Sequence, residues 1–323
     1  MHKFVRNLIT EWRRLGLPFN DATVIVAVSG GADSTALSLA FADLKKRKKL
    51  ELEFVIAHFN HKLRRKESDG DETFVKNLAA KLEFEFVSAN GSLKGKSDLE
   101  QRTRDARYKF LGETANTFNA NVILTAHTMN DQAETVLMNL IRGSGIDGLG
   151  GIKKMRELNE KQRVKLVRPL LKWAKRGDTE SFCHDNKIKP RHDSMNDDMN
   201  FTRVKIRKTV IPLLADVNPN IIETLARTGE LLQSVSHENK ENFGDSLKIA
   251  DLKNLQQNEL YSHIRAWLRE KRGNLRGLQL KHIEAVVRLA NSRKSGRIVE
   301  LPGGQKVIKT GGRLAFRQIR LEN

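Results

Sequence analysis

A six-residue loop, Ser29-Gly30-Gly31-Ala32-Asp33-Ser34, has the residue types needed to hold an anion. It follows the β-branched run Val24–Val28, which is too short for a helix and predicts a buried strand. The sequence from Ser34 onward predicts a helix. Because Gly30 and Gly31 lack Cβ atoms, backbone N–H groups can close on an anion at the N-terminus of that helix. The loop therefore predicts a phosphate-binding site.

The loop differs from two common nucleotide-binding motifs. A Walker A loop requires a lysine that reaches the outer phosphates, and no lysine follows Gly31. The loop also lacks the G-x-G-x-x-G pattern of dinucleotide-binding folds. A strand–turn–helix connection that binds no ligand remains the alternative on these six residues alone.

Carboxylates and histidines follow two further predicted strands. Asp131 and Glu134 are three residues apart at the start of a predicted helix, so their carboxylates can share one face. Helix capping is the alternative, because any helix N-terminus favours acidic residues. His58, His61 and His127 also follow strands. Since no H-x-x-x-H pairing supports a metal site, substrate contact or loop packing is the favoured interpretation of these histidines.

Arginines recur on the helix predicted from Leu99, in the sequence E-Q-R-T-R-D-A-R-Y. Spacings of four and three residues place Glu100, Arg104 and Arg107 on one stripe of this helix. Considered alone, the stripe is an exposed helix surface with an ion pair between Glu100 and Arg104.

The predicted elements bring these groups to one edge of a sheet. Strands are predicted at Val24–Val28, Phe54–Phe59, Phe84–Ala89 and Val122–Ala126, and they alternate with helices at Ser34–Leu44, Glu72–Leu82, Leu99–Phe118 and Asp131–Arg142. Residues 1–20 predict a further amphipathic helix that packs on the sheet. This alternation specifies an α/β fold with a parallel sheet flanked by helices, and ligands bind at the carboxyl ends of such strands. The glycine-rich segment Gly143–Gly151 predicts a mobile loop at the rim of the site.

The chain changes character after about residue 215. Helices are predicted at Pro219–Phe243, Asn258–Arg272 and Gln279–Ser292, and short strands at Arg297–Leu301, Gln305–Thr310 and Arg313–Arg317. We therefore predict two domains, residues 1–215 and a smaller, mainly helical domain at 216–323 that ends in short strands.

Net charge is concentrated in the second part of the chain. Residues 1–150 carry 22 Lys and Arg against 19 Asp and Glu, whereas residues 151–323 carry 36 against 20. Most of the net charge of +19 therefore lies after residue 150. Such an excess suits a polyanion larger than a nucleotide, although a solvated basic surface is the alternative.

Composition narrows the class of protein. The first 20 residues contain charges between their apolar positions, so they are not a signal peptide, and no stretch is apolar enough to span a membrane. A cytoplasmic protein is predicted. Cys183 is the single cysteine, which excludes an internal disulfide or a site that needs two thiols. It is interpreted as a small core residue on a helix.

Seven motifs, taken in order, give a resemblance to a known family. They are S-G-G-A-D-S; H-F-N-H-K-L-R; E-x-x-x-R-x-x-R-Y; T-A-H-x-x-N-D-Q-A-E-T; R-G-S-G-I-D-G-L; R-P-L-L at Arg168; and D-S-M-N with R-V-K-I-R and V-I-P-L-L between Asp193 and Leu214. Together they resemble the tRNA(Ile)-lysidine synthetases of the PP-loop ATP pyrophosphatase superfamily. The resemblance covers about residues 20–215 and implies a Rossmann-like fold of the adenine nucleotide alpha hydrolase type.

The resemblance implies an ATP-dependent ligase. The carbon-2 oxygen of the wobble cytidine, in the isoleucine tRNA with a CAU anticodon, is adenylylated with release of pyrophosphate. The ε-amine of free L-lysine then displaces AMP and gives lysidine. The change converts codon reading from AUG to AUA and the amino-acid identity from Met to Ile.

The resemblance also implies roles for particular residues. Ser29, Gly30, Gly31, Ala32, Asp33 and Ser34 would cradle the phosphates of ATP, and Asp33 would hold Mg²⁺. Asp131 and Glu134 would bind the lysine, and Arg107 would contact the adenylated intermediate. Further contacts with lysine or tRNA are implied for His58, Asn60, His61, Arg64, Arg104, His127, Arg203 and Arg207. The basic C-terminal domain would help to hold tRNA.

The sequence departs from the family pattern at three positions. Thr128 replaces a usual second histidine, Asn130 replaces a frequent aspartate, and Val204 replaces a usual asparagine. The resemblance implies a short form with one C-terminal domain and leaves the oligomeric state open, with a homodimer as one alternative. Two rival functions remain. A PP-loop tRNA thiolation enzyme would use catalytic or cluster-binding cysteines, and a non-catalytic RNA-binding protein would carry a decayed loop.

Overall fold

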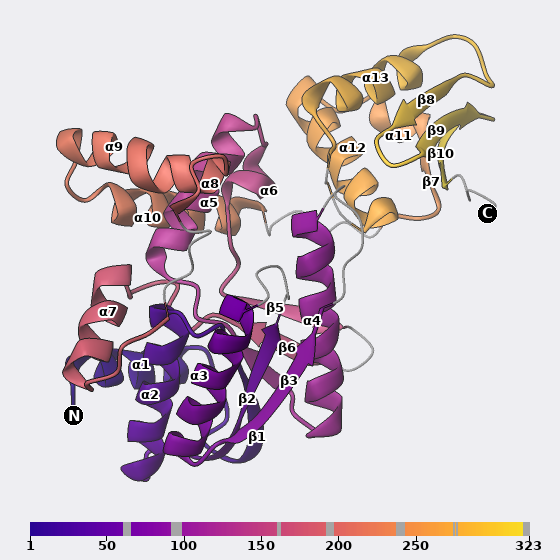
Figure 1. Ribbon diagram of the computed structural model, residues 1–323. Helices are drawn as coiled ribbons and strands as arrows, with labels where there is room; N and C mark the ends of the chain where they lie inside the picture. Colours follow the sequence, from indigo (N-terminus) through magenta and orange to yellow (C-terminus); the bar gives the residue numbers. More distant parts are fainter. Residues whose placement is uncertain are drawn as a thin grey trace. The chain divides into compact units, whose positions relative to one another are not determined.

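The computed structural model describes residues 1–60, 66–91, 99–159, 163–191, 197–236, 243–273, 275 and 277–318 (Figure 1). The chain forms two compact units, Met1–Gln233 and Ser234–Asn323. The domain boundary predicted after residue 215 falls earlier than this division and lies inside helix α9 (Ile211–Val217). His61, Arg64 and the D-S-M-N motif lie outside the described residues.

The first unit contains the predicted alternation of strands and helices. Its elements are α1 (Lys3–Arg14), β1 (Asn20–Ala27), α2 (Ala32–Lys46), β2 (Glu51–Asn60), α3 (Lys66–Leu82), β3 (Glu85–Asn90), α4 (Leu99–Thr117), β4 (Val122–Leu124), α5 (Met129–Ile141), α6 (Ile146–Leu149), β5 (Met155–Asn159), β6 (Val164–Val167), α7 (Arg176–Asp185), α8 (Thr202–Lys205), the π-helical turn η2 (Ile206–Val210), α9 and α10 (Ile221–Ser236). The structure confirms the α/β fold.

The first sheet has six strands in the order β3-β2-β1-β4-β6-β5. Its strand pairs are parallel except β5 with β6, which is antiparallel. The four strands predicted from the sequence correspond to β1–β4 and pair in parallel as expected, and the antiparallel pair is confined to β5 and β6 at this edge. Few residues separate β5 from β6, and a short connection permits only antiparallel pairing, because a parallel pair needs a long crossover.

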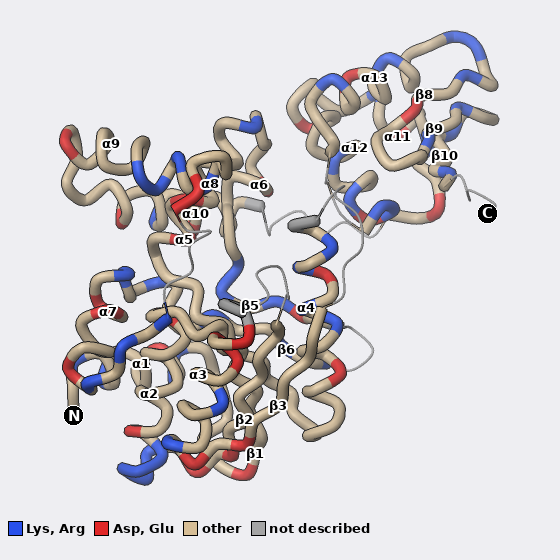
Figure 2. The backbone as a smooth tube through the Cα atoms, viewed as in Figure 1, with Lys and Arg blue, Asp and Glu red and all other residues tan. Residues whose placement is uncertain are grey.

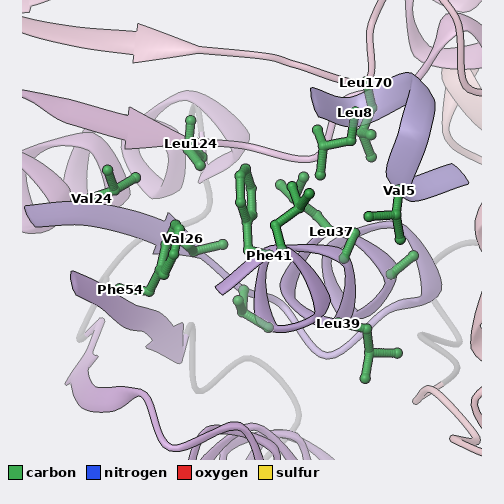
Figure 3. Packing of buried hydrophobic residues seen from close by; sticks show 14 of the residues in the cluster. Val5, Leu8, Val24, Val26, Leu37, Leu39, Phe41, Phe54, Leu124 and Leu170 are labelled. Carbon is green, nitrogen blue, oxygen red and sulfur yellow. The ribbon is translucent and has the colours of Figure 1, made fainter. Parts of the chain in front are cut away.

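Alternate residues of the strands form two separate cores. On one face, Val24, Val26 and Leu124 pack with Leu8 of α1 and Phe41 of α2 (Figure 3). This core also contains residues of α3 and α7. Cys183 of α7 lies in it with 1% of its surface exposed, which confirms its interpretation as a core residue.

The opposite face of the sheet is covered by α4. Ile25, Val55 and Ile123 point to this face and pack with Leu111 and Ala115 of α4. Successive strand residues thus serve different cores, as the two-residue period of a strand requires. Burial on both faces explains why β1 ends in an unbroken apolar run from Val24.

The second unit has its own core. Its elements are β7 (Ser246–Lys248), α11 (Ile249–Leu252), α12 (Gln257–Arg272), α13 (Leu280–Asn291), β8 (Ile298–Leu301), β9 (Gln305–Thr310) and β10 (Arg313–Gln318). The strands form an antiparallel sheet in the order β7-β10-β9-β8. Trp267 of α12, Val286 of α13 and Val307 of β9 are all fully buried in this core. Figure 2 shows Lys and Arg spread along the backbone of this unit.

The glycine-rich segment Gly143–Gly151 is more ordered than the predicted loop. It contains α6, and hydrogen bonds join it to α5 and α10. Gln132 Nε2 donates to Gly150 O at 2.9 Å, and Gln132 Oε1 accepts from Ile152 N at 2.6 Å. Gln233 Nε2 of α10 donates to Ile152 O at 2.9 Å. Two glutamine side chains therefore hold this segment between the two helices.

In the described parts of the chain, each helix is too short or too polar to cross a membrane.

Close packing around Gly229 of α10 gives a prediction for stability. A Cβ atom at Gly229 would lie 2.8 Å from Gln132 Nε2 and 3.1 Å from Gly150 O. We expect Gly229→Ala to lower the free energy of unfolding by about 1–3 kcal/mol, because the added methyl group displaces the Gln132 amide. Gly177→Ala on α7 is the matched control, since no atom lies within 4 Å of its Cβ position. Urea unfolding of both variants measures the effect, and equal stability of the two would contradict it.

Candidate functional site

The loop between β1 and α2 has the geometry of an anion-binding turn. Gly30 has φ +94°, a conformation that a residue with a Cβ atom adopts only with strain. Ser34 Oγ fixes the turn, because it accepts from Ser29 N at 3.2 Å and donates to Gly31 O at 3.2 Å. The N–H groups of Ala32 and Asp33, at the start of α2, have no acceptor among the described residues. A bound anion would supply that acceptor.

Asp33 lies in the first turn of α2 and is held by α7. Thr179 Oγ1 donates to Asp33 Oδ1 at 2.5 Å. Burial, aided by the Asp131 carboxylate and opposed by Thr179 and Arg176, raises the pKa of Asp33 to about 6. The influence of Asp131 on this pKa places the two carboxylates in one electrostatic environment. They come from the loops that follow the adjacent strands β1 and β4.

Glu134 of α5 is a buried carboxylate paired with three arginines. Only 1% of its side chain is exposed. Arg203 Nε and Arg207 Nε each donate to it at 2.7 Å, and Arg176 Nη2 lies 3.4 Å from Glu134 Oε1. A second contact, from Arg203 Nη2 to Asp131 Oδ1 at 2.9 Å, extends the cluster. The predicted pairing of Asp131 and Glu134 on one helix face is thus present, with arginines as the described partners.

Asp131 also caps its own helix. Its Oδ2 accepts from the N–H of Thr128 at 2.8 Å and from Thr128 Oγ1 at 3.1 Å. Burial raises the pKa of Asp131, but Arg203, His127 and the Thr128 amide outweigh this and hold it below its usual value. Asp131 is therefore ionised at neutral pH, beside a second acid, Asp33, that protonates more readily.

The three departures from the family pattern have structural roles. Thr128 is the N-cap of α5. Asn130 Oδ1 accepts from the backbone N–H of Arg176 at 2.9 Å, which joins α5 to α7. Val204 of α8 is buried.

Histidine and asparagine side chains lie at the same sheet edge. His58, near the end of β2, contacts Val28 O through Nδ1 at 2.8 Å, and its buried Nε2 has no partner among the described residues. Asn60 Nδ2 donates to Glu72 at 3.0 Å. His127 contacts Thr125 Oγ1 through Nδ1 at 2.9 Å. Burial lowers the pKa of His127 to about 3, aided by Arg168, Arg107 and Arg203 and opposed by Asp131, so this imidazole is neutral.

The predicted site residues fall into two groups. Asp33, Asp131, Glu134, Arg203 and Arg207 belong to one connected set of contacts and electrostatic influences. Arg104 and Arg107 of α4 lie over the ring of Tyr108 at 5.5 and 5.2 Å, and Arg107 is linked to the first group only through its charge, which acts on His127 together with Asp131 and Arg203. The side chain of Glu100, the third member of the predicted stripe, lies outside what the structure describes. The predicted contacts with ATP, lysine and tRNA stay predictions.

Two residues of the site were missed from the sequence. Thr179 and Arg176 contact Asp33 and Glu134 from 146 and 42 residues away in the chain. No spacing rule connects positions so far apart. The only local signal was the helix start at Arg176-Gly177-Asp178, which places their backbone but not their partners.

A nucleotide with Mg²⁺ fits the residues of this loop. The donors at the start of α2 suit phosphate oxygens, and carboxylate oxygen is the ligand that Mg²⁺ prefers. Within the residues that the structure describes, no three His, Cys, Asp or Glu side chains form a metal site by themselves. Mg²⁺ is commonly bound by one or two carboxylates together with the phosphates of the substrate. The single carboxylate of Asp33 is therefore compatible with a Mg²⁺ site of this type.

Comparison with known proteins agrees with this geometry. A family model described as a PP-loop domain matches residues 3–214. The chain belongs to the PP-loop family. The resemblance inferred from the sequence motifs is confirmed at this level, and Ser29–Ser34 is its PP loop.

Within the PP-loop family, the chain is similar to curated proteins that share one name. The chain is 32% identical over 310 residues to a tRNA(Ile)-lysidine synthase from Dehalococcoides mccartyi (strain CBDB1), covering 90% of this chain and 65% of that protein. It is 33% identical over 312 residues to a protein of the same name from Geobacter sulfurreducens, covering 91% and 64%. The chain thus spans a little under two thirds of the length of these relatives.

A solved structure supports the fold. The U34-tRNA thiolase NcsA from Methanococcus maripaludis, determined with its [4Fe-4S] cluster, matches with a TM-score of 0.61 and 18% identity. The match covers 76% of this chain and 81% of that chain. At this identity the likeness concerns the PP-loop fold alone.

The raised pKa of Asp33 predicts a pH dependence of stability. Because the folded state holds this proton more tightly than the unfolded chain, the stabilising effect of protonation is lost as pH rises from about 4 through 6. Asp33→Asn removes this titration. Between pH 4 and 7, without divalent cations, the variant should gain on the order of 2 kcal/mol of unfolding free energy relative to wild type. Urea unfolding at several pH values tests this, and parallel pH profiles would refute it.

Proposed function

We propose that this chain is a tRNA(Ile)-lysidine synthase. It would adenylylate the carbon-2 oxygen of the wobble cytidine in the CAU-anticodon isoleucine tRNA and then join free L-lysine to that carbon. The first step forms a P–O bond and releases pyrophosphate. In the second, a C–N bond forms, AMP leaves with the oxygen, and the lysine amine loses protons.

One observation supports the proposal most directly. Helix α7 links Asp33 of the PP loop to the carboxylates of α5, because its Thr179 donates to Asp33 and its Arg176 reaches Glu134, and Asp131 also raises the pKa of Asp33. A phosphate-binding loop beside an ionised carboxylate suits a reaction that uses both ATP and a second substrate with an ammonium group. The curated relatives carry the name of this reaction.

The PP loop would bind and orient ATP. The N–H groups of Ala32 and Asp33 would donate to phosphate oxygens, and Asp33 would hold Mg²⁺, which supplies positive charge against the developing pyrophosphate. Since protons compete for Asp33, cation binding should strengthen as pH rises through 6.

Of the two α5 carboxylates, Asp131 would bind the lysine substrate and Glu134 would support it. An ammonium needs anionic acceptors, and a carboxylate can accept a proton from an attacking amine. Arg203 and Arg207 occupy these carboxylates in the structure. Lysine would therefore bind at Asp131, whose side chain is 15% exposed, while Glu134 with 1% exposure would mainly hold the arginines.

The basic second unit would contact tRNA. Its helices and strands carry many Lys and Arg residues, which suits a phosphate backbone. Since the proposed substrates are a tRNA and ATP, the cytoplasm is the proposed location.

Cys183 bears on the thiolation alternative. It is the single cysteine in the sequence, and burial raises its pKa to about 12. A thiol in this environment is not a nucleophile at neutral pH.

Product formation tests the proposal. With ATP, Mg²⁺ and isoleucine tRNA, the protein should release pyrophosphate, and AMP release should require added L-lysine. Asp33→Ala should abolish pyrophosphate release and retain tRNA affinity, because it removes a cation ligand and leaves the basic surface unchanged. Mass analysis of the tRNA would identify lysidine, and sulfur incorporation would instead support thiolation. Binding of tRNA without any product would support the non-catalytic alternative.

The division of roles between the two carboxylates predicts that substitution of Asp131 affects the kinetics, whereas substitution of Glu134 affects the stability. Asp131→Asn should raise the KM for lysine about tenfold or more with a smaller effect on the KM for ATP, because a charged contact to the ammonium is lost. Glu134→Gln should lower the unfolding free energy by about 3 kcal/mol, since the three arginines that pair with this buried carboxylate lose their counter-charge. Steady-state kinetics and urea unfolding separate these outcomes. Equal losses for both substrates in Asp131→Asn would support helix capping as its only role.

A further inference from the structure

Four arginines surround the side chain of Tyr108 on α4. The guanidinium carbons of Arg156, Arg107 and Arg104 lie 4.9, 5.2 and 5.5 Å from the centre of its ring. The fourth, Arg168, follows β6, and its charge also acts on the Tyr108 hydroxyl. We call these five side chains the Tyr108 cluster. Arginine stacking on an aromatic face is favourable, but the ring carries no net charge to neutralise the cations.

The Tyr108 cluster has unmatched donors and unmatched charge. In the part of the chain that the structure describes, none of its four arginines has an ion-pair partner. Arg168 has 3% of its surface exposed, and its Nε has no hydrogen-bond partner among those residues, nor has Arg107 Nε. Arg168 Nη1 is bound to Lys153 O at 2.6 Å. Buried donors without acceptors are uncommon and indicate a place for a missing acceptor.

The positive potential of the cluster reaches its neighbours. Burial would raise the pKa of Tyr108, but the four guanidinium groups outweigh it and lower the pKa to about 8. Arg107 and Arg168 also help to keep His127 neutral. An oxyanion among the guanidinium groups would relieve this repulsion, and planar guanidinium groups match phosphate oxygens in geometry.

The cluster lies on the sheet edge beyond the PP loop. The PP loop follows β1, whereas Arg168 follows β6 and Arg156 lies in β5, two and three strands away in the sheet order. At about 4.8 Å per strand this is roughly 10–15 Å. The PP loop already has its own backbone donors for the phosphates of a nucleotide. A separate phosphate is therefore the better ligand for the cluster.

We propose that the Tyr108 cluster is a second phosphate-binding subsite, which holds a backbone phosphodiester of the tRNA. This inference rests on the proposed function for the identity of its ligand. Arg156 and Arg168 contact the phosphate, with Arg104 and Arg107 closing the subsite from α4. Tyr108 is a positioning residue, because its ring is the surface on which the guanidinium groups stack.

Salt-dependent binding tests the subsite in the full-length protein. Arg156→Gln should weaken affinity for isoleucine tRNA about tenfold, as expected for loss of a charge-assisted hydrogen bond. It should also reduce the slope of log affinity against log salt by about 0.7–0.9 for the lost phosphate contact. Tyr108→Leu should reduce the slope similarly, whereas Tyr108→Phe retains the ring and should keep it. Thermal melting confirms that each variant is folded.

A matched control is available on the same helix. Lys109 is exposed and lies 3.8 Å from Glu113. Lys109→Gln removes one positive charge next to Tyr108 in sequence and should leave the slope unchanged. An equal change in slope for Lys109→Gln and Arg156→Gln would overturn the subsite in favour of general surface charge.

A separate measurement of ATP binding shows whether the phosphate in the subsite comes from the nucleotide or from the tRNA. ATP affinity, measured without tRNA, should be unaffected by Arg156→Gln. If ATP affinity falls and tRNA binding does not, the subsite belongs to the nucleotide and the proposal is wrong.

The proposed function and the proposed phosphate subsite can be refuted independently of each other. If wild type forms lysidine but Arg156→Gln keeps the tRNA affinity and slope, the subsite is refuted and the proposed function stands. If wild type forms no lysidine but Arg156→Gln lowers the slope for RNA, the function is refuted and a phosphate subsite remains. If wild type binds no RNA, both are refuted.

Discussion

The buried carboxylate of Glu134 constrains how the helices around the PP loop are arranged. A buried charge is costly unless it is paired and hydrogen-bonded, and Glu134 is paired through three arginines from different segments. Arg176 comes from α7, Arg203 from α8 and Arg207 from η2. Each pairing joins its segment to α5. The same contacts bring α7 to the PP loop, where Thr179 of that helix donates to Asp33. The PP loop and the α5 carboxylates are thus positioned by one network.

Two acids with different pKa values lie at the sheet edge as a result of this arrangement. Asp33 and Asp131 lie after β1 and β4, and burial makes Asp33 readily protonated while Arg203 and the Thr128 amide keep Asp131 ionised. Two acids with different pKa values can serve different purposes. Asp33 can hold a cation only when a ligand or a higher pH removes its proton, whereas Asp131 is negatively charged both below and above that pH. The low pKa of Asp131 comes from the charge of Arg203 and, to a lesser extent, from the Thr128 amide that Asp131 caps. Capping and substrate binding are therefore compatible roles for one carboxylate.

Local sequence patterns predicted the elements and failed where long-range partners decide the structure. The strand–loop–helix unit around Gly30 was predictable, because a β-branched run, two glycines and a helical pattern are contiguous. The shared helix face of Asp131 and Glu134 followed from their spacing. The partners of Glu134, Arg203 and Arg207, are 69 and 73 residues away, and no periodicity encodes such contacts. Strands β5 and β6 are short and were missed for a related reason, since the packing of β6 beside β4 stabilises them more than local propensity does.

Two arginine clusters in one unit differ in what neutralises them. The arginines around Glu134 share a buried carboxylate, with Asp131 as a second acceptor, so two of their three positive charges are neutralised by these carboxylates. The arginines around Tyr108 share an aromatic ring, whose attraction for a cation is about 0.5–2 kcal/mol and leaves the net charge in place. The edge of the sheet therefore becomes more positive from the β1 and β4 loops, with their two acids, toward β6 and β5. A complex in which an ammonium approaches Asp131 while a phosphodiester lies among the arginines would be favoured by this gradient at both ends. The order of the strands, which places β4 between β1 and β6, fixes the direction of the gradient.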